Sequence, residues 1–245
     1  MKIAQVAMVL LLGIVLMSGL ACGNSGVEPT PTPGPDPTPP PVEGSVELPE
    51  AYQYTRAWAR DDETIVMHIW VKGENSRADW SLYETSPEKN EKIKFIDDGE
   101  YKWIYEVDEH WAAKYQTEDM VHPAEEHMLW FSENYYGNMS EGDILSAMQA
   151  TCDIDTQCSR ASITGHETID GQPCTKYTYR AYDDSEIVYW ISNSGYLVQV
   201  KYTDTAGWTT TTKFTDIDLN PSVSDDIFDI SKVAPGAIIV DMTAS

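Results

Sequence analysis

The sequence predicts an α+β domain that is mostly β, and three features of its 245 residues support this. Apolar and polar residues alternate along several segments of the first half, as in strands with one buried face. Two segments near the middle show helical spacing instead. Alternating segments separated by turn residues then resume. We therefore expect an antiparallel sheet with helices inserted in the middle of the chain.

The first half predicts a meander of strands. Residues 64–72 and 101–107 alternate most clearly, and residues 92–96 form a further strand between them. Asp97-Asp98-Gly99-Glu100 is a hairpin signal, because Asp-Gly tolerates the positive φ that tight turns need. Residues 110–116 would extend the meander.

Two helices are expected next. The first covers residues 122–136, because Pro123 suits a first helical turn and Gly137-Asn138 ends the pattern. Its apolar side chains are Met128, Leu129, Phe131 and Tyr135. Ser140 resembles an N-cap for the second helix. That helix carries Ile144, Leu145 and Met148.

Strands resume near Ala161 and continue to the C-terminus. The predicted strands cover residues 175–182, 186–192, 196–202, 208–217 and 238–241. Asp170-Gly171 and Asn193-Ser194-Gly195 mark turns between strands. The segment from Asn220 contains Pro221 and Pro235 and is expected to be irregular before the last strand.

The N-terminus has the pattern of a lipoprotein signal peptide over residues 1–21. Lys2 precedes an apolar stretch, and Gly19-Leu20-Ala21 precedes Cys22, the expected lipidation site. The leucine lies one position closer to the cysteine than is usual. A retained membrane helix and a plain secreted protein are the alternatives, although the stretch is near the lower limit for a span.

Residues 22–47 are expected to form a lipid-anchored stalk rich in Pro and Thr. Alternating prolines fix φ and lack amide donors, so this segment cannot form a core. At about 3.1 Å per residue, Pro29 to Pro41 would reach roughly 40 Å. The folded domain is then expected to cover residues 48–245, a length that can bury a real core.

The charge of the chain is strongly acidic, at −24. Loss of residues 1–21 removes one charged side chain, Lys2, so that −24 becomes −25. Such a charge repels nucleic acid backbones, and we expect no nucleic acid partner. It also disfavours electrostatic docking on anionic lipid surfaces.

Three cysteines remain once Cys22 is assigned to lipidation: Cys152, Cys158 and Cys174. In an oxidising compartment we expect one disulfide and one leftover thiol. Cys152 and Cys158 are close in sequence and form the favoured pair, with Cys174 as an alternative partner. Their spacing does not match a metal site.

Several segments together resemble the LolA-like lipoprotein-carrier superfamily, which includes lipoprotein-sorting proteins of the outer membrane, LppX-type lipoproteins and RseB-type sensors. The matching segments are residues 69–77, 95–105, 165–171, 188–192, 195–198 and 214–220, with Phe228. The resemblance implies a half-barrel, a strongly curved antiparallel sheet whose concave face is covered by the helices. It also implies that acyl chains of lipids or lipoproteins bind between sheet and helices. It carries over no catalytic residues, so we expect a protein that is not an enzyme.

Motifs for other chemistry are weak. His122 and His127 are five residues apart with Pro123 between them, so they do not form a zinc-protease motif. Asp153-Ile-Asp155 lacks the glycine and glutamate of a calcium loop. We therefore expect no metal and no cofactor. A hydrolase with paired carboxylates stays open, because that site depends on spatial separation alone.

The aromatic residues suggest the ligand cavity. Eight Trp and 14 Tyr outnumber four Phe, and such rings suit surfaces that are apolar on one side and wet on the other. Flexible methionines adapt to irregular apolar ligands. The candidate cavity residues are Met67, Ile69, Trp103, Tyr105, Met128, Met148 and Trp190.

These patterns favour a monomeric extracytoplasmic lipoprotein, held at the cell membrane through acylated Cys22, that binds a lipid or the acyl part of another lipoprotein. An anchored protein of this kind would act near the membrane and would not travel through the periplasm. The alternative is an envelope sensor or an adhesion module that binds protein and carries no lipid.

Overall fold

The computed structural model describes residues 48–60, 63–84, 91–117, 131–155, 161–181 and 183–243. Every described residue belongs to one compact unit, Val42–Ser245. The predicted signal peptide and Cys22 lie outside the described residues.

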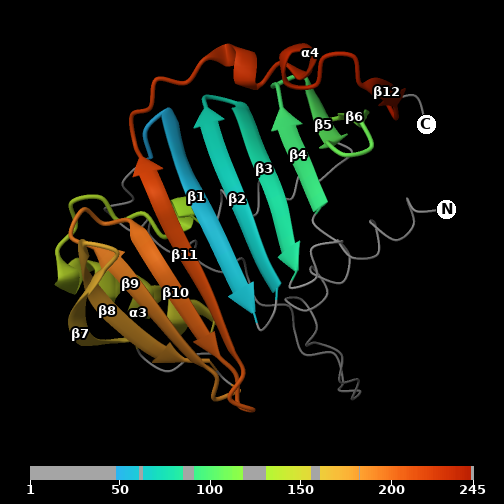
Figure 1. Cartoon of the computed structure of the whole chain (residues 1–245). Coiled ribbons are helices and arrows are strands. Elements are labelled where there is room, and N and C mark those ends of the chain that lie inside the picture. The colour runs from blue at the N-terminus through green and yellow to red at the C-terminus, as the bar shows by residue number, and fades with distance from the viewer. Residues whose placement is uncertain are drawn as a thin grey trace, which may run out of the picture. The chain divides into compact units, whose positions relative to one another are not determined.

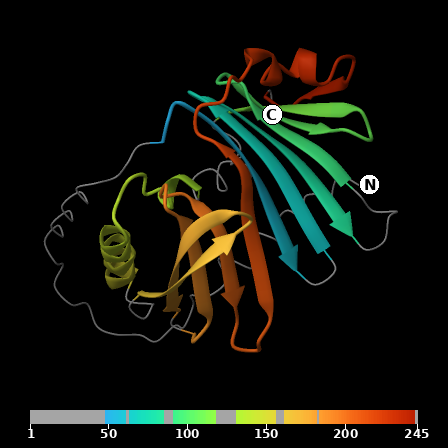
Figure 2. The same cartoon turned by 60° about the vertical axis from the view of Figure 1, so that its left-hand side comes forward.

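The described strands form one sheet of twelve strands in the order β12-β6-β5-β4-β3-β2-β1-β11-β10-β9-β8-β7 (Figure 1). The strands are β1 (Ala51–Arg60), β2 (Glu63–Lys72), β3 (Asn75–Glu84), β4 (Glu91–Asp97), β5 (Tyr101–Glu106), β6 (Trp111–Gln116), β7 (Ser162–Ile169), β8 (Gln172–Arg180), β9 (Glu186–Ser192), β10 (Leu197–Thr203), β11 (Thr209–Asp218) and β12 (Ile238–Asp241). The described helices are α3 (Glu141–Asp155), the 3₁₀ turn η2 (Asp225–Ile227) and α4 (Ile230–Val233). The sheet is strongly curved, and α3 lies on its concave side (Figure 2). This confirms the predicted α+β, mostly β fold.

Two strands, β1 and β3, are absent from the sequence-based prediction. Tyr52, Tyr54 and Trp58 occupy alternate positions of β1, but Arg56 interrupts the apolar series. In β3 the series Ala78, Trp80 and Leu82 is short, and it alternates with Arg77 and Asp79 on the opposite face. Both strands are central in the sheet and pair along their whole length with β2. Pairing on both sides therefore stabilises two strands whose apolar series is interrupted in β1 and short in β3.

The local signals in the other segments are confirmed. Gly99 has φ +85 in the β4–β5 hairpin, and Gly195 has φ +76 in the turn between β9 and β10. Ser140 caps α3, since its Oγ accepts the N–H of Asp143 at 3.3 Å. Of the first predicted helix, only residues 131–136 are described, and residues 131–133 are helical.

The segment after β11 contains two short helical turns and then β12. All described strand pairings are antiparallel except that of β12 with β6, which is parallel. The parallel pairing requires a crossover, and η2 and α4 lie within it. The predicted last strand, residues 238–241, is confirmed.

The two faces of the sheet have different covers, and we name them by these covers. On the helix face, one cross-strand row contains Tyr54, Ile69, Ala78 and Phe95. On the tail face, one row contains Trp70, Arg77, Ile96 and Trp103. Adjacent residues of one strand belong to opposite faces, because side chains alternate along a strand.

The C-terminal tail packs on the tail face. Phe228 is 2% exposed and contacts Ile96 and Trp103, while Ala234 packs against Tyr105. Polar contacts also hold the residues just before Phe228 against the sheet. Lys72 Nζ donates to the carboxylate of Asp225 at 2.6 Å, and Arg77 donates to the carbonyl of Ile227 at 3.1 Å.

One close backbone contact joins the end of the first helical segment to the β9–β10 turn. The N–H of Tyr136 donates to the carbonyl of Gly195 at 2.7 Å. A Cβ added to Gly195 would overlap the backbone of Gly137, which itself has φ +52. Only glycine therefore allows this approach.

We predict that Gly195→Ala lowers the free energy of unfolding by at least about 3 kcal/mol, because positive φ and backbone overlap act together. Urea denaturation of the purified protein measures the change. Gly207→Ala is the matched control, since Gly207 has φ +86 and nothing within 4 Å of an added Cβ. It should cost only about 1–2 kcal/mol. Equal losses in the two variants would contradict the importance of the Gly137–Gly195 contact.

Candidate functional site

The helix face has a closed part built from aromatic rings. Phe131, which is 0% exposed, stacks on Tyr54 with ring centroids 4.3 Å apart and lies 5.7 Å from Phe214. Tyr52 adds a fourth ring, 6.1 Å from Phe131. Because Tyr54 belongs to β1 and Phe214 to β11, Phe131 covers the line where these two strands pair.

The rest of this face across β1–β3 is apolar but only half-buried. Its members lie in two adjacent cross-strand rows that contain neighbours on β1, β2 and β3. We call this group the apolar patch, and it consists of Trp58, Ile65, Met67, Trp80 and Leu82. Ligand sites are mostly apolar with few polar groups, so the patch is the candidate site for an apolar ligand.

One cation lies within these rows. Arg56 aligns with Met67 on β2, and Met67 aligns with Trp80 on β3. Burial lowers the pKa of Arg56 to about 10, and the nearby Tyr54 hydroxyl partly opposes this effect. Burial also raises the pKa of Tyr52 to about 12. Both groups keep their ordinary charge at neutral pH.

Helix α3 is attached to the helix face of β7 and β8 through its first residue. Thr175 Oγ1 donates to the Glu141 carboxylate at 2.7 Å, and His166 Nε2 lies 3.0 Å from the same oxygen. Tyr177 donates to the Glu141 carbonyl at 3.4 Å. The hydrogen bonds from Thr175 and His166 lower the pKa of Glu141. Ile144 and Met148 form the buried side of α3.

Several tyrosines pack on the helix face at this end of the sheet. Tyr179 and Tyr189 stack with centroids 5.7 Å apart, and their hydroxyls lie 3.2 Å from each other. Burial raises the pKa of Tyr136 and of Tyr177 to about 12. These hydroxyls therefore stay protonated and act as neutral hydrogen-bonding groups.

Three of the seven predicted cavity residues lie on the helix side of the sheet. Met67 and Ile69 point to the helix face from β2, and Met67 belongs to the apolar patch. Met148 is buried on α3, which contacts β7 and β8, several strands from β2. Met128 lies outside the described residues.

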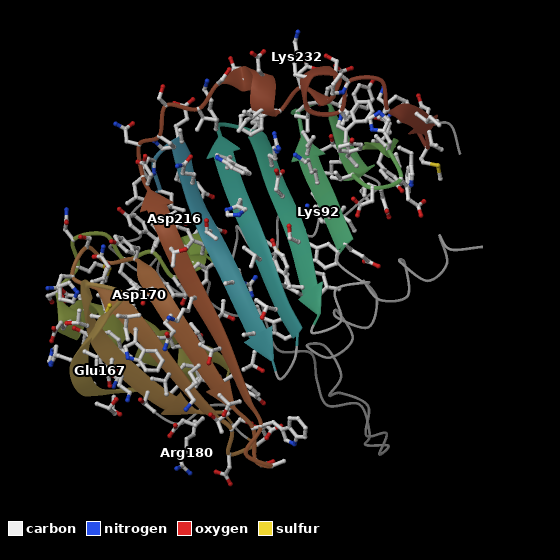
Figure 3. The ribbon with its side chains drawn as sticks, in the orientation of Figure 1. Lys92, Glu167, Asp170, Arg180, Asp216 and Lys232 are labelled. Carbon is white, nitrogen blue, oxygen red and sulfur yellow. The ribbon has the colours of Figure 1, made fainter. Side chains whose placement is uncertain are left out.

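The other three predicted cavity residues lie on the tail face. Trp103 and Tyr105 are covered by the C-terminal tail. Trp190 is 5% exposed, donates to Glu167 at 3.1 Å and has Lys176 Nζ 5.3 Å from its ring centroid. Glu167 lies on the outermost strand β7 (Figure 3). The structure therefore does not bring these three residues together with Met67 and Ile69.

Ile65 of the apolar patch is missing from the candidates chosen from sequence, although its strand β2 was expected. Trp58, Trp80 and Leu82 are missing as well. They lie on β1 and β3, the two strands that the sequence-based prediction omitted. Their period-2 spacing with Tyr54 and Ala78 was a usable signal. Arg56 interrupts this series on β1, whereas the shorter series on β3 is uninterrupted.

The cysteines and histidines have structural surroundings where they are described. Cys174 is a free, buried thiol, and burial raises its pKa. The side chain of Cys152 and all of Cys158 lie outside the described residues, so their pairing stays a prediction. His68 lies 2.9 Å from Thr55 Oγ1, and His110 lies 3.0 Å from the Tyr105 hydroxyl.

Among the residues with described positions, no three His, Cys, Asp or Glu side chains form a group that could hold a metal ion. His122 and His127, the near-miss zinc motif, lie outside those residues. Within the same described part of the chain, no helix has both the length and the apolar character needed to cross a bilayer.

The sequence matches one family model, described as a predicted periplasmic protein (DUF2092), over residues 69–242. No curated protein matches the chain. This match covers most of the folded unit, from β2 to the end of the C-terminal tail.

The chain is also similar to several solved structures. Lipoprotein LppX from Mycobacterium tuberculosis is 12% identical, with a TM-score of 0.39, over 72% of this chain and 90% of LppX. MucB in the MucA/MucB complex of Pseudomonas aeruginosa is 10% identical, with a TM-score of 0.41, over 77% of this chain and 57% of that chain. A LolA superfamily protein from Nitrosomonas europaea is 12% identical, with a TM-score of 0.27, over 77% and 94%. These three structures belong to the kinds of protein that the sequence resembles. Their similarity to this chain is too weak to carry an argument about function.

We predict that the attachment of α3 weakens in acid. The pKa of Glu141 is lowered in the folded protein, so its ionised form stabilises the fold above the ordinary value of 4.5. This contribution disappears as the pH falls below 4.5 and through the lowered pKa. Glu141→Gln should therefore be less stable than the native chain at pH 7, and the difference should shrink below pH 4.5.

Urea denaturation at a series of pH values measures this difference. Thr175→Val removes the hydroxyl donor with little change of shape and should reduce the same pH-dependent contribution. Stability curves of the native chain and of Glu141→Gln that stay parallel through the acid range would contradict the assignment.

Proposed function

The chain belongs to the DUF2092 family of predicted periplasmic proteins, and we propose that it is a membrane-anchored lipoprotein that binds acyl chains of a lipid or of another lipoprotein. In this proposal the ligand lies against the apolar patch, between the sheet and the helical segments. The protein holds its ligand and performs no catalytic step.

The observation that carries this proposal is the incomplete cover of the apolar patch. Tyr54, on which Phe131 stacks, and Ile69 are 2% and 0% exposed, whereas Met67 and Trp80 on the same face are only half-buried. Burying one methylene group contributes about 0.8 kcal/mol, so roughly ten methylenes would contribute about 8 kcal/mol before the cost of ordering the chain. An acyl chain would also bury the exposed part of the patch.

The chemistry of the patch favours an acyl chain over a polar ligand. Its five members offer two indole N–H groups and a thioether as their polar atoms, and the rest of their surface is hydrocarbon. Methionine and leucine adapt to flexible chains. A ligand with many hydroxyl or charged groups would leave most of those groups unpaired at such a surface, although Arg56 lies in the same rows.

The anchor supports the same proposal by position. Cys22 follows an apolar signal and precedes a proline-rich segment, so acylation would tie the domain to a membrane. A stalk of roughly 40 Å allows the domain to move near the bilayer but not away from it. The net charge of −24 disfavours binding to anionic headgroups, so the attraction to lipid would come from apolar contact.

We predict that Met67→Gln weakens binding of cis-parinaric acid, a fluorescent fatty acid, about tenfold, because the buried amide would lack hydrogen-bond partners. The measurement is a fluorescence titration of the purified protein. Val66→Thr is the matched control, because Val66 is the half-buried neighbour of Met67 on the opposite face of β2.

The control should change affinity less than twofold. Mass spectrometry of solvent extracts from the native protein should also show co-purified lipid. Absence of both bound lipid and probe binding would contradict the proposed function and favour the alternative of a protein-binding sensor or adhesion module. Equal loss in both variants would place the ligand elsewhere.

For the anchor we predict that the mature protein carries a diglyceride on Cys22 and that Cys22→Ala releases it from membranes. Cell fractionation and intact mass measurement test both statements. If the Cys22→Ala protein stays in the membrane fraction, the N-terminal segment is retained as a membrane helix and the lipidation proposal is wrong.

A further inference from the structure

Strand β12 forms one outer edge of the sheet and exposes apolar side chains on both faces. Ile238, Ile239, Val240 and Met242 are 69%, 48%, 43% and 41% exposed. They account for four of the eight exposed large hydrophobic residues among those described. Contiguous exposed apolar patches often mark interaction sites.

The backbone of β12 has hydrogen-bonding groups directed outward. The N–H groups of Ile238 and Met242 donate to the carbonyls of His110 and Lys114 on the β6 side. Alternate residues of a strand bond to the same neighbour, so the N–H and C=O of Ile239 and Asp241 point away from β6. An added strand could pair with these four groups.

The opposite edge of the same sheet is protected against such pairing. Strand β7 contains a register irregularity between Ile163 and Gly165. Its exposed side chains include His166, which lies at hydrogen-bond distance from Glu141, and Glu167, which forms an ion pair with Lys176. Bulges and charges are the usual means by which edge strands avoid pairing with other chains. β12 shows neither feature along Ile238–Val240.

An acidic corner lies at the start of β12. Glu106 aligns with Trp111, and Trp111 aligns with Ile238, so the three lie in one cross-strand row. Asp108 and Glu109 lie in the turn that leads to His110. Burial raises the pKa of Glu106, and the negative charges of Glu109, Glu91 and Asp108 raise it further. The corner therefore favours a cationic neighbour.

We propose that the outer edge of β12 binds an extended peptide segment of another protein as an added strand, with a lysine or arginine of that segment near Asp108 and Glu109, in the turn that leads to His110 at the start of β12. The apolar side chains of β12 would pack against alternate apolar residues of the segment on both faces. This interaction surface is separate from the apolar patch and does not depend on lipid binding.

A second copy of the chain is a poorer partner for this edge. Antiparallel pairing of two β12 strands would place the acidic corner of one copy beside Asp241 of the other. Each copy also carries a net charge of −24, so self-association brings like charges together. A basic segment avoids both the local repulsion at Asp241 and the repulsion between two acidic chains.

The probe is a fluorescein-labelled peptide, Lys-Lys-Thr-Ile-Thr-Val-Thr-Val, titrated with the mature full-length chain in detergent and followed by fluorescence anisotropy. We expect Ile239→Pro to weaken binding at least tenfold. Proline removes an outward N–H but no hydrogen bond to β6, so the strand itself can persist. Ile239→Val should stay within twofold of the native chain, and so should Ile163→Lys on β7.

Changes in the peptide test the proposal without altering the protein. Replacing both lysines with glutamate should weaken binding at least tenfold, and the difference should shrink as salt is added. Two further peptides carry N-methyl groups on alternate backbone amides, one on the odd-numbered and one on the even-numbered residues. An added strand donates only alternate N–H groups to its neighbour, so one of these peptides should lose binding and the other should keep it.

Equal binding to Ile239→Pro and to the native chain, or equal binding of the two methylated peptides, would overturn the proposal. Failure of the lysine peptide to bind at all would do the same. Sedimentation that shows a dimer abolished by Ile239→Pro would assign the edge to a second copy instead. Loss of lipid binding in the Met67→Gln protein, with peptide binding unchanged, is the expected pattern for two separate sites.

Discussion

The pairing of β1 with β11 is the interaction on which the rest of this structure depends. Strands β1 to β6 form one consecutive series and β7 to β11 form another, and this single pairing joins them into one sheet. Arg56 lies opposite Phe214 across the join, and Phe131 packs over Tyr54 and Phe214. The helical segment thus covers the place where strands distant in sequence meet, and it brings α3 to the second half of the sheet.

One sheet with two covers separates the two proposed sites. On the helix face, aromatic rings close one part and leave the apolar patch half-buried, which suits a ligand that completes the core. On the tail face, Phe228 and its neighbours bury Trp103 and hold the C-terminal segment against β4 to β6. That segment continues into β12, which pairs with β6 at the edge of the sheet. Apolar ligand and peptide would therefore engage different faces and edges of the same framework.

The candidate site could be predicted only in part, because an alternating strand has two possible inner faces. Met67 and Ile69 lie on the helix face, where β2 carries its most apolar series, and their role in a cavity stays a prediction. Trp103 and Tyr105 belong to an equally regular series, but the C-terminal tail folds back over them. Trp190 is covered by Lys176 and Glu167 from neighbouring strands. Nothing within each strand reveals these covers.

By itself the sequence determined the local features: the strands with regular alternation, the turns at Gly99 and Gly195, the Ser140 cap and the mostly β composition. These depend on contacts within a few residues. The tertiary structure decided the strand order, the central places of β1 and β3, the parallel pairing of β12 and the face to which each aromatic ring points. Those features depend on hydrogen bonds and packing between segments far apart in the chain, which no local pattern records.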